Sequence, residues 1–351
     1  MYIVIAILAF GILIAVHELW HFVTAKLLGV KVNEFSIGMG PAVFKRQKGE
    51  TLYSLRCLPI GGFCAMEGED EDTGDERAFT VQPAWKKILI LIAGALMNFL
   101  LGLIIVMILY SGSAAFVSNQ VSYTEETFPY GGENGIMPGD IICSIDGARV
   151  YYAEDFSMYM NRAGSTVDMT ILRDGEKVTL ENYQLQPTEY PDGSGGTVTR
   201  YGISFKTIPA TVGEKLKYSC YTSYNFVRMV WMGLSDLITG RAGIRDMAGV
   251  VGIVSTINEV GEKSDTTSIA LSNIAYLCAF IAVNLAVMNL LPIPALDGGR
   301  VFFVIINCIA ELITRKKVNP KYEGYVHAAG LVLLLGLMAY VMFNDIVRII
   351  S

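Results

Sequence analysis

The chain has 351 residues, enough for two or three structural units, and 52% of them are hydrophobic. Charged residues make up only 17%, and the formal net charge of −6 comes without a basic run that would suit nucleic acid. The six cysteines are scattered and form no C-x-x-C pair. The composition therefore argues against nucleic-acid binding, zinc knuckles and disulfide-rich scaffolds, and it favours a membrane protein.

The first apolar segment, residues 2–28, is long enough to cross a bilayer, because a span needs about 20 mostly apolar residues. No positive charge precedes it and no clear small-x-small cleavage site follows it. We therefore expect the segment to be retained rather than removed as a signal peptide. Its second half contains the polar sequence HELWHF, which begins at His17.

The HELWHF motif has the spacing of a metal site. His17 and His21 are four residues apart, so on a helix both lie on one face and can reach one metal ion. H-E-x-x-H is the zinc-protease pattern in which the glutamate, here Glu18, acts as general base. The alternative is a satisfied polar helix face. Polar groups at membrane depth are expensive unless they are paired or bound, which favours the metal site.

Residues 31–87 predict a β region, and residues 88–111 predict the second span. Alternating residues and glycine-rich turns in VNEFSIGMG and TLYSLRCLPIGGFCAM indicate short strands. The acidic run from Glu67 to Glu76 is expected to be a solvated loop. Asn98, inside the second span, has the chemistry of a contact between membrane helices.

Residues 115–207 predict a small β-rich domain. PGDIICSIDGARV indicates a turn, a strand and a tight Asp-Gly turn, and TVDMTILRDGEKVTL indicates a hairpin across Asp174 and Gly175. Residues 211–272 predict an amphipathic juxtamembrane region. Residues 273–351 hold the third and fourth spans.

The third span ends in NLLPIPALDGGR, residues 289–300, where Asp297 is the one carboxylate. Pro292 and Pro294 break the helix, and the Gly-Gly pair after Asp297 lets the backbone bend and approach closely. Irregular backbone at membrane depth is tolerated where it is buried in protein or lines a wet cavity. A catalytic zinc usually has three protein ligands, and Asp297 is the candidate third. The alternative is an aspartate that caps the next helix.

Basic residues set the expected orientation. They gather between the first and second spans (Lys26, Lys31, Lys45, Arg46, Lys48, Lys86 and Lys87) and between the third and fourth (Arg300, Arg315, Lys316, Lys317 and Lys321). The positive-inside rule places both segments in the cytoplasm, with both termini and the long segment 111–273 outside. With a rise of about 1.5 Å per residue, His17 lies roughly 22 Å along the first helix, in the cytoplasmic third of the bilayer. The inward third span brings Asp297 to the same depth.

Seven pieces that cover most of the chain carry a resemblance to a known family: HELWHF, FSIGMGPAVF (35–44), LPIGGFCAMEGE (58–69), AFTVQPAWKKILILIAGALMN (78–98), GIMPGDIICSIDGARV (135–150), LITGRAGIRDMAGVVGI (237–253) and NLLPIPALDGG (289–299). HExxH and LDGG lie at opposite ends, with a PDZ-like insert between them. In this set the chain resembles the site-2 protease family of intramembrane zinc metalloproteases, and within it the RseP/RasP class.

The resemblance implies a multi-pass α-helical membrane protein with about four transmembrane helices. A membrane-associated β-hairpin region would lie on the cytoplasmic side, and an inserted PDZ domain would be extracytoplasmic. It implies Zn2+ held by His17, His21 and Asp297, with Glu18 activating water. It also implies that Asn289 and Asn284 hold the unwound substrate strand. From their chemistry alone, these two amides in an apolar helix need partners, and helix–helix contact is the alternative.

The sequence thus predicts an intramembrane zinc endopeptidase of the bacterial cell membrane that cleaves single-span membrane proteins within the lipid bilayer. The family implies substrates of the anti-sigma factor or signal-peptide remnant type, trimmed beforehand by another protease. One alternative is a membrane metal transporter or sensor, which would also use histidine and aspartate in its spans. The other is an inactive PDZ scaffold, against which the intact metal set speaks. Peptide binding and steric filtering both stay open for the PDZ groove.

Overall fold

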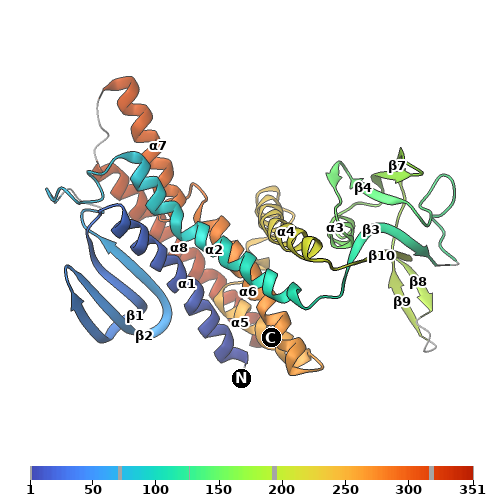
Figure 1. Ribbon diagram of the computed structural model, residues 1–351, viewed down its shortest axis with the longest axis horizontal. Helices are drawn as coiled ribbons and strands as arrows, with labels where there is room; N and C mark the ends of the chain where they lie inside the picture. Colours follow the sequence, from blue (N-terminus) through green and yellow to red (C-terminus); the bar gives the residue numbers. More distant parts are fainter. Residues whose placement is uncertain (1, 70–72, 126, 192–195, 316–319, 351) are drawn as a thin grey trace. The chain divides into compact units, whose positions relative to one another are not determined.

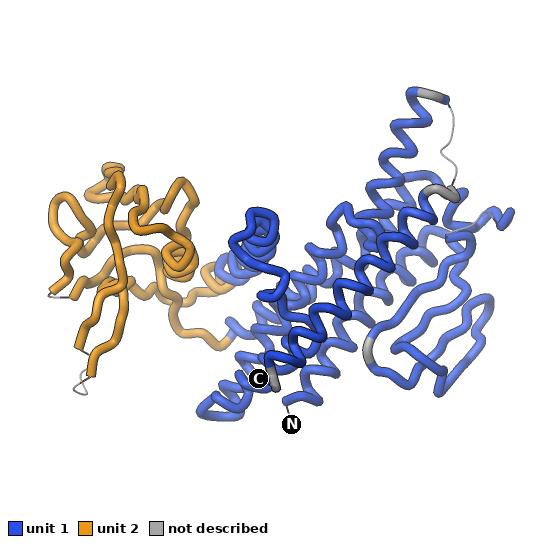
Figure 2. The backbone as a smooth tube through the Cα atoms, turned by 180° about the vertical axis from the view of Figure 1, so that it is seen from behind, with its two compact units in different colours: residues 1–111, 216–351 blue, residues 112–215 orange. Residues whose placement is uncertain are grey.

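The computed structural model describes residues 2–69, 73–125, 127–191, 196–315 and 320–350 (Figure 1). The chain forms two compact units (Figure 2). Unit 1 contains residues 1–111 and 216–351, and unit 2 contains residues 112–215. The chain therefore passes from unit 1 into unit 2 and back again, so unit 2 is an insertion into unit 1.

Four helices of unit 1 are long and apolar enough to cross a membrane within the described residues: α1 (Tyr2–Leu27), α2 (Ala84–Ser111), α6 (Thr267–Asn289) and, within α8 (Pro320–Ile350), Glu323–Arg348. They coincide with the four predicted spans, although α8 extends beyond the predicted residues 327–343 at both ends. The chain is accordingly a membrane protein with several apolar helices.

Helix α2 is the centre of unit 1, since it packs against α1, α6 and α7 (Asp297–Thr314). Small residues allow the close contact with α6. A Cβ carbon added to Gly102 would lie 2.7 Å from Val283 Cγ2 and 3.0 Å from the Ala279 carbonyl oxygen. Such glycine contacts let membrane helices approach where no hydrophobic effect drives them together.

The β region forms two long antiparallel strands, β1 (Val32–Lys48) and β2 (Thr51–Met66). The first half of β1 is central: Phe35 pairs with Cys64 on one side and with Tyr53 on the other. Strand β2 lies directly on α1, because a Cβ carbon on Gly11 would lie 2.5 Å from the Pro59 carbonyl oxygen. The predicted short strands are thus two bent strands that pack against the first span.

The described part of the acidic run after β2 lies outside helices and strands, as expected, and two of its side chains form ion pairs. The described side chains of Glu67 and Asp75 each lie 3.1 Å from Lys31 Nζ. Residues 70–72 of the run lie outside the described residues. At both described ends, the run is therefore tied to the start of β1 by ion pairs.

Unit 2 contains a sheet in the order β10 (Ile203–Pro209), β3 (Ala115–Thr124), β4 (Ile141–Ile145), β6 (Val167–Arg173) and β7 (Glu176–Tyr183), with β5 (Ala148–Arg149) beside β4. It also contains α3 (Ala153–Met160) and the hairpin of β8 (Thr188–Pro191) and β9 (Thr197–Arg200).

Both Asp-Gly turns predicted in unit 2 are present. Asp146 and Gly147 have φ values of 47° and 76°, and Asp174 and Gly175 have φ values of 51° and 87°. Positive φ at both central residues is the geometry that makes Asp-Gly a preferred hairpin turn. The small β-rich domain predicted for residues 115–207 is therefore seen in the structure.

The segments flanking the third span contain more helix than predicted. The expected amphipathic region holds α4 (Val212–Thr239), the 3-10 helix η1 (Ile244–Asp246) and α5 (Val250–Lys263). Helix α7 occupies most of the segment between the third and fourth spans, which the sequence interpretation treated as a loop. Its basic residues Lys316 and Lys317 lie outside the described residues.

Candidate metal centre

Two segments that are distant in sequence supply the predicted metal ligands. Helix α1 carries His17 and His21 on one face, as their spacing requires. Helix α6 ends at Asn289, and Asp297 is the first residue of α7. The proline-containing segment between them breaks the helix as predicted and turns the chain toward α1.

Close backbone packing sets the position of Asp297. A Cβ carbon on Gly298 would lie 2.3 Å from the Leu290 carbonyl carbon, and one on Gly299 would lie 2.2 Å from the Ile293 carbonyl oxygen. Only glycine leaves room for the start of α7 to lie this close to the preceding segment. That segment is also held by His327, whose Nδ1 accepts a hydrogen bond of 3.0 Å from the Ala295 N–H.

The three side chains converge. Asp297 Oδ2 lies 3.1 Å from His17 Nε2 and 3.3 Å from His21 Nε2, and the two Nε2 atoms are 3.0 Å apart. Both histidines are buried, each with 6% of its surface exposed. Among the described residues, these three form the one group of at least three His, Cys, Asp or Glu side chains whose ligand atoms lie within 4.8 Å of one another.

The donor set fits a zinc ion. Two imidazole nitrogens and a carboxylate oxygen are three of the ligands that a catalytic zinc uses, leaving a fourth position open. Asp297 Oδ2 is buried and receives no hydrogen bond, although two nitrogens lie within 3.3 Å of it. A cation held among these electron-pair donors would satisfy an oxygen that is otherwise costly to bury.

Helix α2 forms the wall behind the histidines. The Ile90 carbonyl oxygen lies 2.8 Å from His21 Nδ1. Because a carbonyl can only accept, Nδ1 carries the proton and His21 Nε2 presents its lone pair toward Asp297. One turn along α2, a Cβ carbon on Gly94 would lie 2.5 Å from His21 Nε2 and 2.8 Å from His17 Nδ1. After another turn, Asn98 Nδ2 lies 3.4 Å from His17 Nδ1.

The sequence interpretation missed this α2 wall. It gave Asn98 only a role in helix–helix contact and gave Gly94 none. The spacing of residues 90, 94 and 98 places them on one face of a helix, which is a usable signal, but nothing in that spacing says that the face meets the histidines.

The remaining predicted site residues differ in their distance from the cluster. Asn289 Nδ2 lies 3.5 Å from His17 Nε2, so this amide is beside the candidate metal position. No hydrogen bond joins Asn284 to the cluster in the part of the chain that the structure describes. Glu18, next to His17, faces β2, since a Cβ carbon on Gly62 would lie 3.4 Å from Glu18 Cγ.

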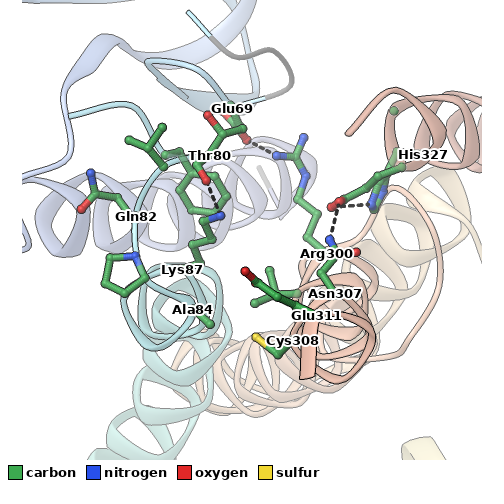
Figure 3. Close-up of a pocket in the computed structure, with 16 residues that line it drawn as sticks. Glu69, Thr80, Gln82, Ala84, Lys87, Arg300, Asn307, Cys308, Glu311 and His327 are labelled. Atoms are coloured by element: carbon green, nitrogen blue, oxygen red, sulfur yellow. Dashed lines mark hydrogen bonds and ion pairs between the residues drawn. The ribbon is translucent and has the colours of Figure 1, made fainter. Parts of the chain in front are cut away.

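A separate cavity of about 330 Å³ lies at the start of α7 (Figure 3). Arg300, one turn after Asp297, pairs with Glu69 across it at 2.6 Å, and Lys87 reaches the Thr80 carbonyl oxygen at 2.5 Å. Both charged side chains are engaged by groups that line the cavity, and none of these residues is among the candidate metal ligands. We therefore assign the cavity no part in the metal centre.

We expect Gly94→Ala to weaken zinc binding, because its methyl group would displace at least one imidazole from the position described above. Alanine favours a helix over glycine by about 1 kcal/mol, so a loss of helix stability would not explain the result. The measurement is the zinc dissociation constant of the purified protein, obtained by competition with a chelator.

Gly336→Ala is the matched control for Gly94→Ala. Gly336 lies in the membrane-length helix α8, and an added Cβ carbon there meets no atom within 4 Å. Its zinc affinity should equal that of the wild type. Equal affinity in the Gly94→Ala protein would mean that the wall does not constrain the histidines.

Comparisons with known proteins show which family the chain resembles. The model of "Peptidase family M50" matches residues 5–337. A Clostridium perfringens protein whose name assigns it as a zinc metalloprotease is 37% identical over 350 residues, covering 99% of both chains. A Clostridium acetobutylicum protein with the same assignment is 38% identical, covering 98% of this chain and 97% of its own. The regulator of sigma-W protease RasP of Bacillus subtilis is 27% identical over 427 residues, covering 98% and 97%.

Proposed function

The chain belongs to peptidase family M50, and on this premise we propose that it is an intramembrane zinc endopeptidase that cleaves single-span membrane proteins within the bilayer. One observation carries the proposal: His17, His21 and Asp297 converge, with Glu18 beside them, on helices of a chain with four membrane-length apolar helices. A peptide bond within lipid is shielded from water. The polar cluster would hold a water molecule there, together with the groups that activate it.

Zinc held by His17, His21 and Asp297 would acidify a water molecule and polarise the carbonyl oxygen of the scissile bond. Glu18 would accept the proton of that attacking water and pass it to the leaving amine. Glu18 directly follows His17 in the chain, so the base would lie beside the metal. It is not among the three side chains that converge as candidate ligands.

The substrate would bind as an extended strand. A helical span hides its peptide bonds in its own hydrogen bonds, so it has to unwind before cleavage. The segment of β2 near Gly62 lies beside Glu18, and an extended peptide added to a sheet edge gains main-chain hydrogen bonds without a fixed sequence. We propose that Asn289 holds the unwound strand next to the metal and that Asn284 assists farther along α6.

The proposed topology follows the distribution of basic residues, with the β region on the cytoplasmic side and unit 2 outside. Unit 2 would be a PDZ domain that either binds peptide or excludes untrimmed substrates. The proposed type of substrate is an anti-sigma factor or a signal-peptide remnant in a bacterial cell membrane. The name of one relative, regulator of sigma-W protease RasP, supports the first of these.

Cleavage of a purified reporter tests the proposal. The full chain is reconstituted in liposomes with two single-span reporters that differ only by a Gly-Gly pair at the centre of the span. We expect cleavage within the span, faster for the helix-weakened reporter, abolished by a zinc chelator and restored by zinc. Zinc flux across the liposomes without cleavage of either reporter would instead identify a transporter.

Labelling with an impermeant thiol reagent tests the topology. Cys57, Cys143, Cys220 and Cys308 are first replaced by serine, and Lys177→Cys provides an exposed thiol in β7 of unit 2. We expect this thiol to be labelled on intact cells. Labelling only after lysis would place unit 2 in the cytoplasm and reverse the proposed orientation of every span.

A further inference from the structure

Each histidine of the metal centre has one ring nitrogen facing Asp297 and the other facing α2. His21 Nδ1 faces the Ile90 carbonyl oxygen at 2.8 Å, and His17 Nδ1 faces the side-chain amide of Asn98 at 3.4 Å. The two contacts differ in kind. A carbonyl can only accept a hydrogen bond, whereas an amide side chain can donate through its nitrogen or accept through its oxygen.

This difference matters because an imidazole can offer Nε2 to a metal only as the tautomer that carries its proton on Nδ1. The Ile90 carbonyl enforces that tautomer on His21. For His17 the outcome depends on which end of the Asn98 amide faces it. With Nδ2 toward the ring, His17 Nδ1 accepts and the proton lies on Nε2, where it would block a ligand bond.

We infer that Asn98 is a positioning residue for the metal centre, whose amide oxygen accepts a hydrogen bond from His17 Nδ1–H and so leaves His17 Nε2 free to bind zinc. The inference rests on the proposed zinc function.

The burial of Asn98 supports this role. The residue is 0% exposed, so bulk water does not compete for its amide. Its Oδ1 is buried without a hydrogen-bond partner in the orientation described. A half-turn about the last side-chain bond exchanges the two amide atoms and brings Oδ1 to His17 Nδ1. The turned amide gives the buried oxygen a partner and selects the metal-binding tautomer, while Nδ2 moves to the place that Oδ1 held.

The helix-contact role expected for Asn98 does not require an amide that can turn. A contact between spans would be made by an amide that bonds to the backbone of another helix. The Asn98 amide instead contacts the ring nitrogen of the candidate ligand His17. Residues that orient a metal-binding imidazole typically affect metal affinity about 10–100-fold.

Three variants of the full chain test the inference, with zinc affinity measured by chelator competition on the zinc-free purified proteins. Asn98→Leu keeps the branching of the side chain but removes the acceptor, and we expect it to bind zinc about 10–100-fold more weakly. Asn98→Asp keeps an acceptor and cannot donate, so we expect its affinity to stay within about threefold of the wild type or to exceed it. Asn225→Leu removes a buried amide from α4, away from the histidines, and should leave zinc affinity unchanged.

Near wild-type zinc affinity in Asn98→Asp, beside weak affinity in Asn98→Leu, would show that Asn98 acts as a hydrogen-bond acceptor for His17 and not only as a packing residue. Wild-type affinity in Asn98→Leu would overturn the inference, and so would equal losses in the leucine and aspartate variants. If Asn98→Leu does not fold, Asn98→Ala replaces it in the same comparison. If the wild type itself binds no zinc, the proposed function fails, which this experiment distinguishes from a failure of Asn98 alone.

Discussion

The Glu18→Gln protein should keep its zinc but cleave a single-span reporter about 10²–10⁴-fold more slowly than the wild type. Glu18 is adjacent to the ligand His17 but is not one of the three converging side chains. Glutamine preserves the shape of the side chain and removes the atom that would accept the water proton. Zinc content and reporter cleavage are measured on the same purified samples.

Glu259→Gln is the control for Glu18→Gln, because Glu259 lies exposed on α5 and pairs with Lys263 along its own helix at 3.1 Å. It should cleave at the wild-type rate. Normal cleavage by Glu18→Gln would contradict the base role of Glu18 and would favour the metal transporter. Loss of zinc from Glu18→Gln would make Glu18 a ligand instead.

The four membrane-length helices and the three converging candidate ligands could be predicted because their signals are local or nearly so. Length and hydropathy define the spans whatever they pack against. The spacing of His17 and His21 is a property of one helix. Asp297 was the one carboxylate beside a helix break, so a short range of sequence again contained the information.

The wall of the site could not be predicted in the same way, because it depends on which face of α2 meets α1. Asn98 and His17 are 81 positions apart, and Ile90 contributes a backbone carbonyl that no side-chain pattern marks. Gly94 shows its role only when the distance to the imidazoles is known. Register between two packed helices is a tertiary property.

The extent of helix α7 was also missed, for a different reason. Its apolar residues recur at helical spacing, but two prolines precede it and basic residues follow it, which are features that also mark a loop. The pairing of β1 with two parts of β2 could not be predicted either. Alternation of apolar and polar residues predicts strands but does not say which strands are neighbours.

Asp297→Asn should lose zinc and activity together, in contrast to Glu18→Gln. The substitution keeps the volume of the side chain, so the close glycine contacts at the start of α7 are undisturbed. It replaces a charged oxygen by a neutral amide at the point where two imidazole nitrogens lie within 3.3 Å. We expect zinc affinity to fall by more than the roughly 10–100-fold that loss of an outer hydrogen bond costs.

A weakened start of α7 is the competing explanation for a defect in Asp297→Asn, because Asp297 is the first residue of that helix and its charge favours the helix N-terminus. For a largely buried carboxylate such as Asp297, that interaction contributes about 0.3–2 kcal/mol, equivalent to at most roughly a thirtyfold change in affinity. Asp265→Asn serves as the control, since Asp265 lies before the start of α6, roughly 35 Å along that helix from the site. It should bind zinc normally. Full zinc occupancy and activity in Asp297→Asn would place the third ligand elsewhere and would remove the main support for the convergence of α1 and α7 on one metal.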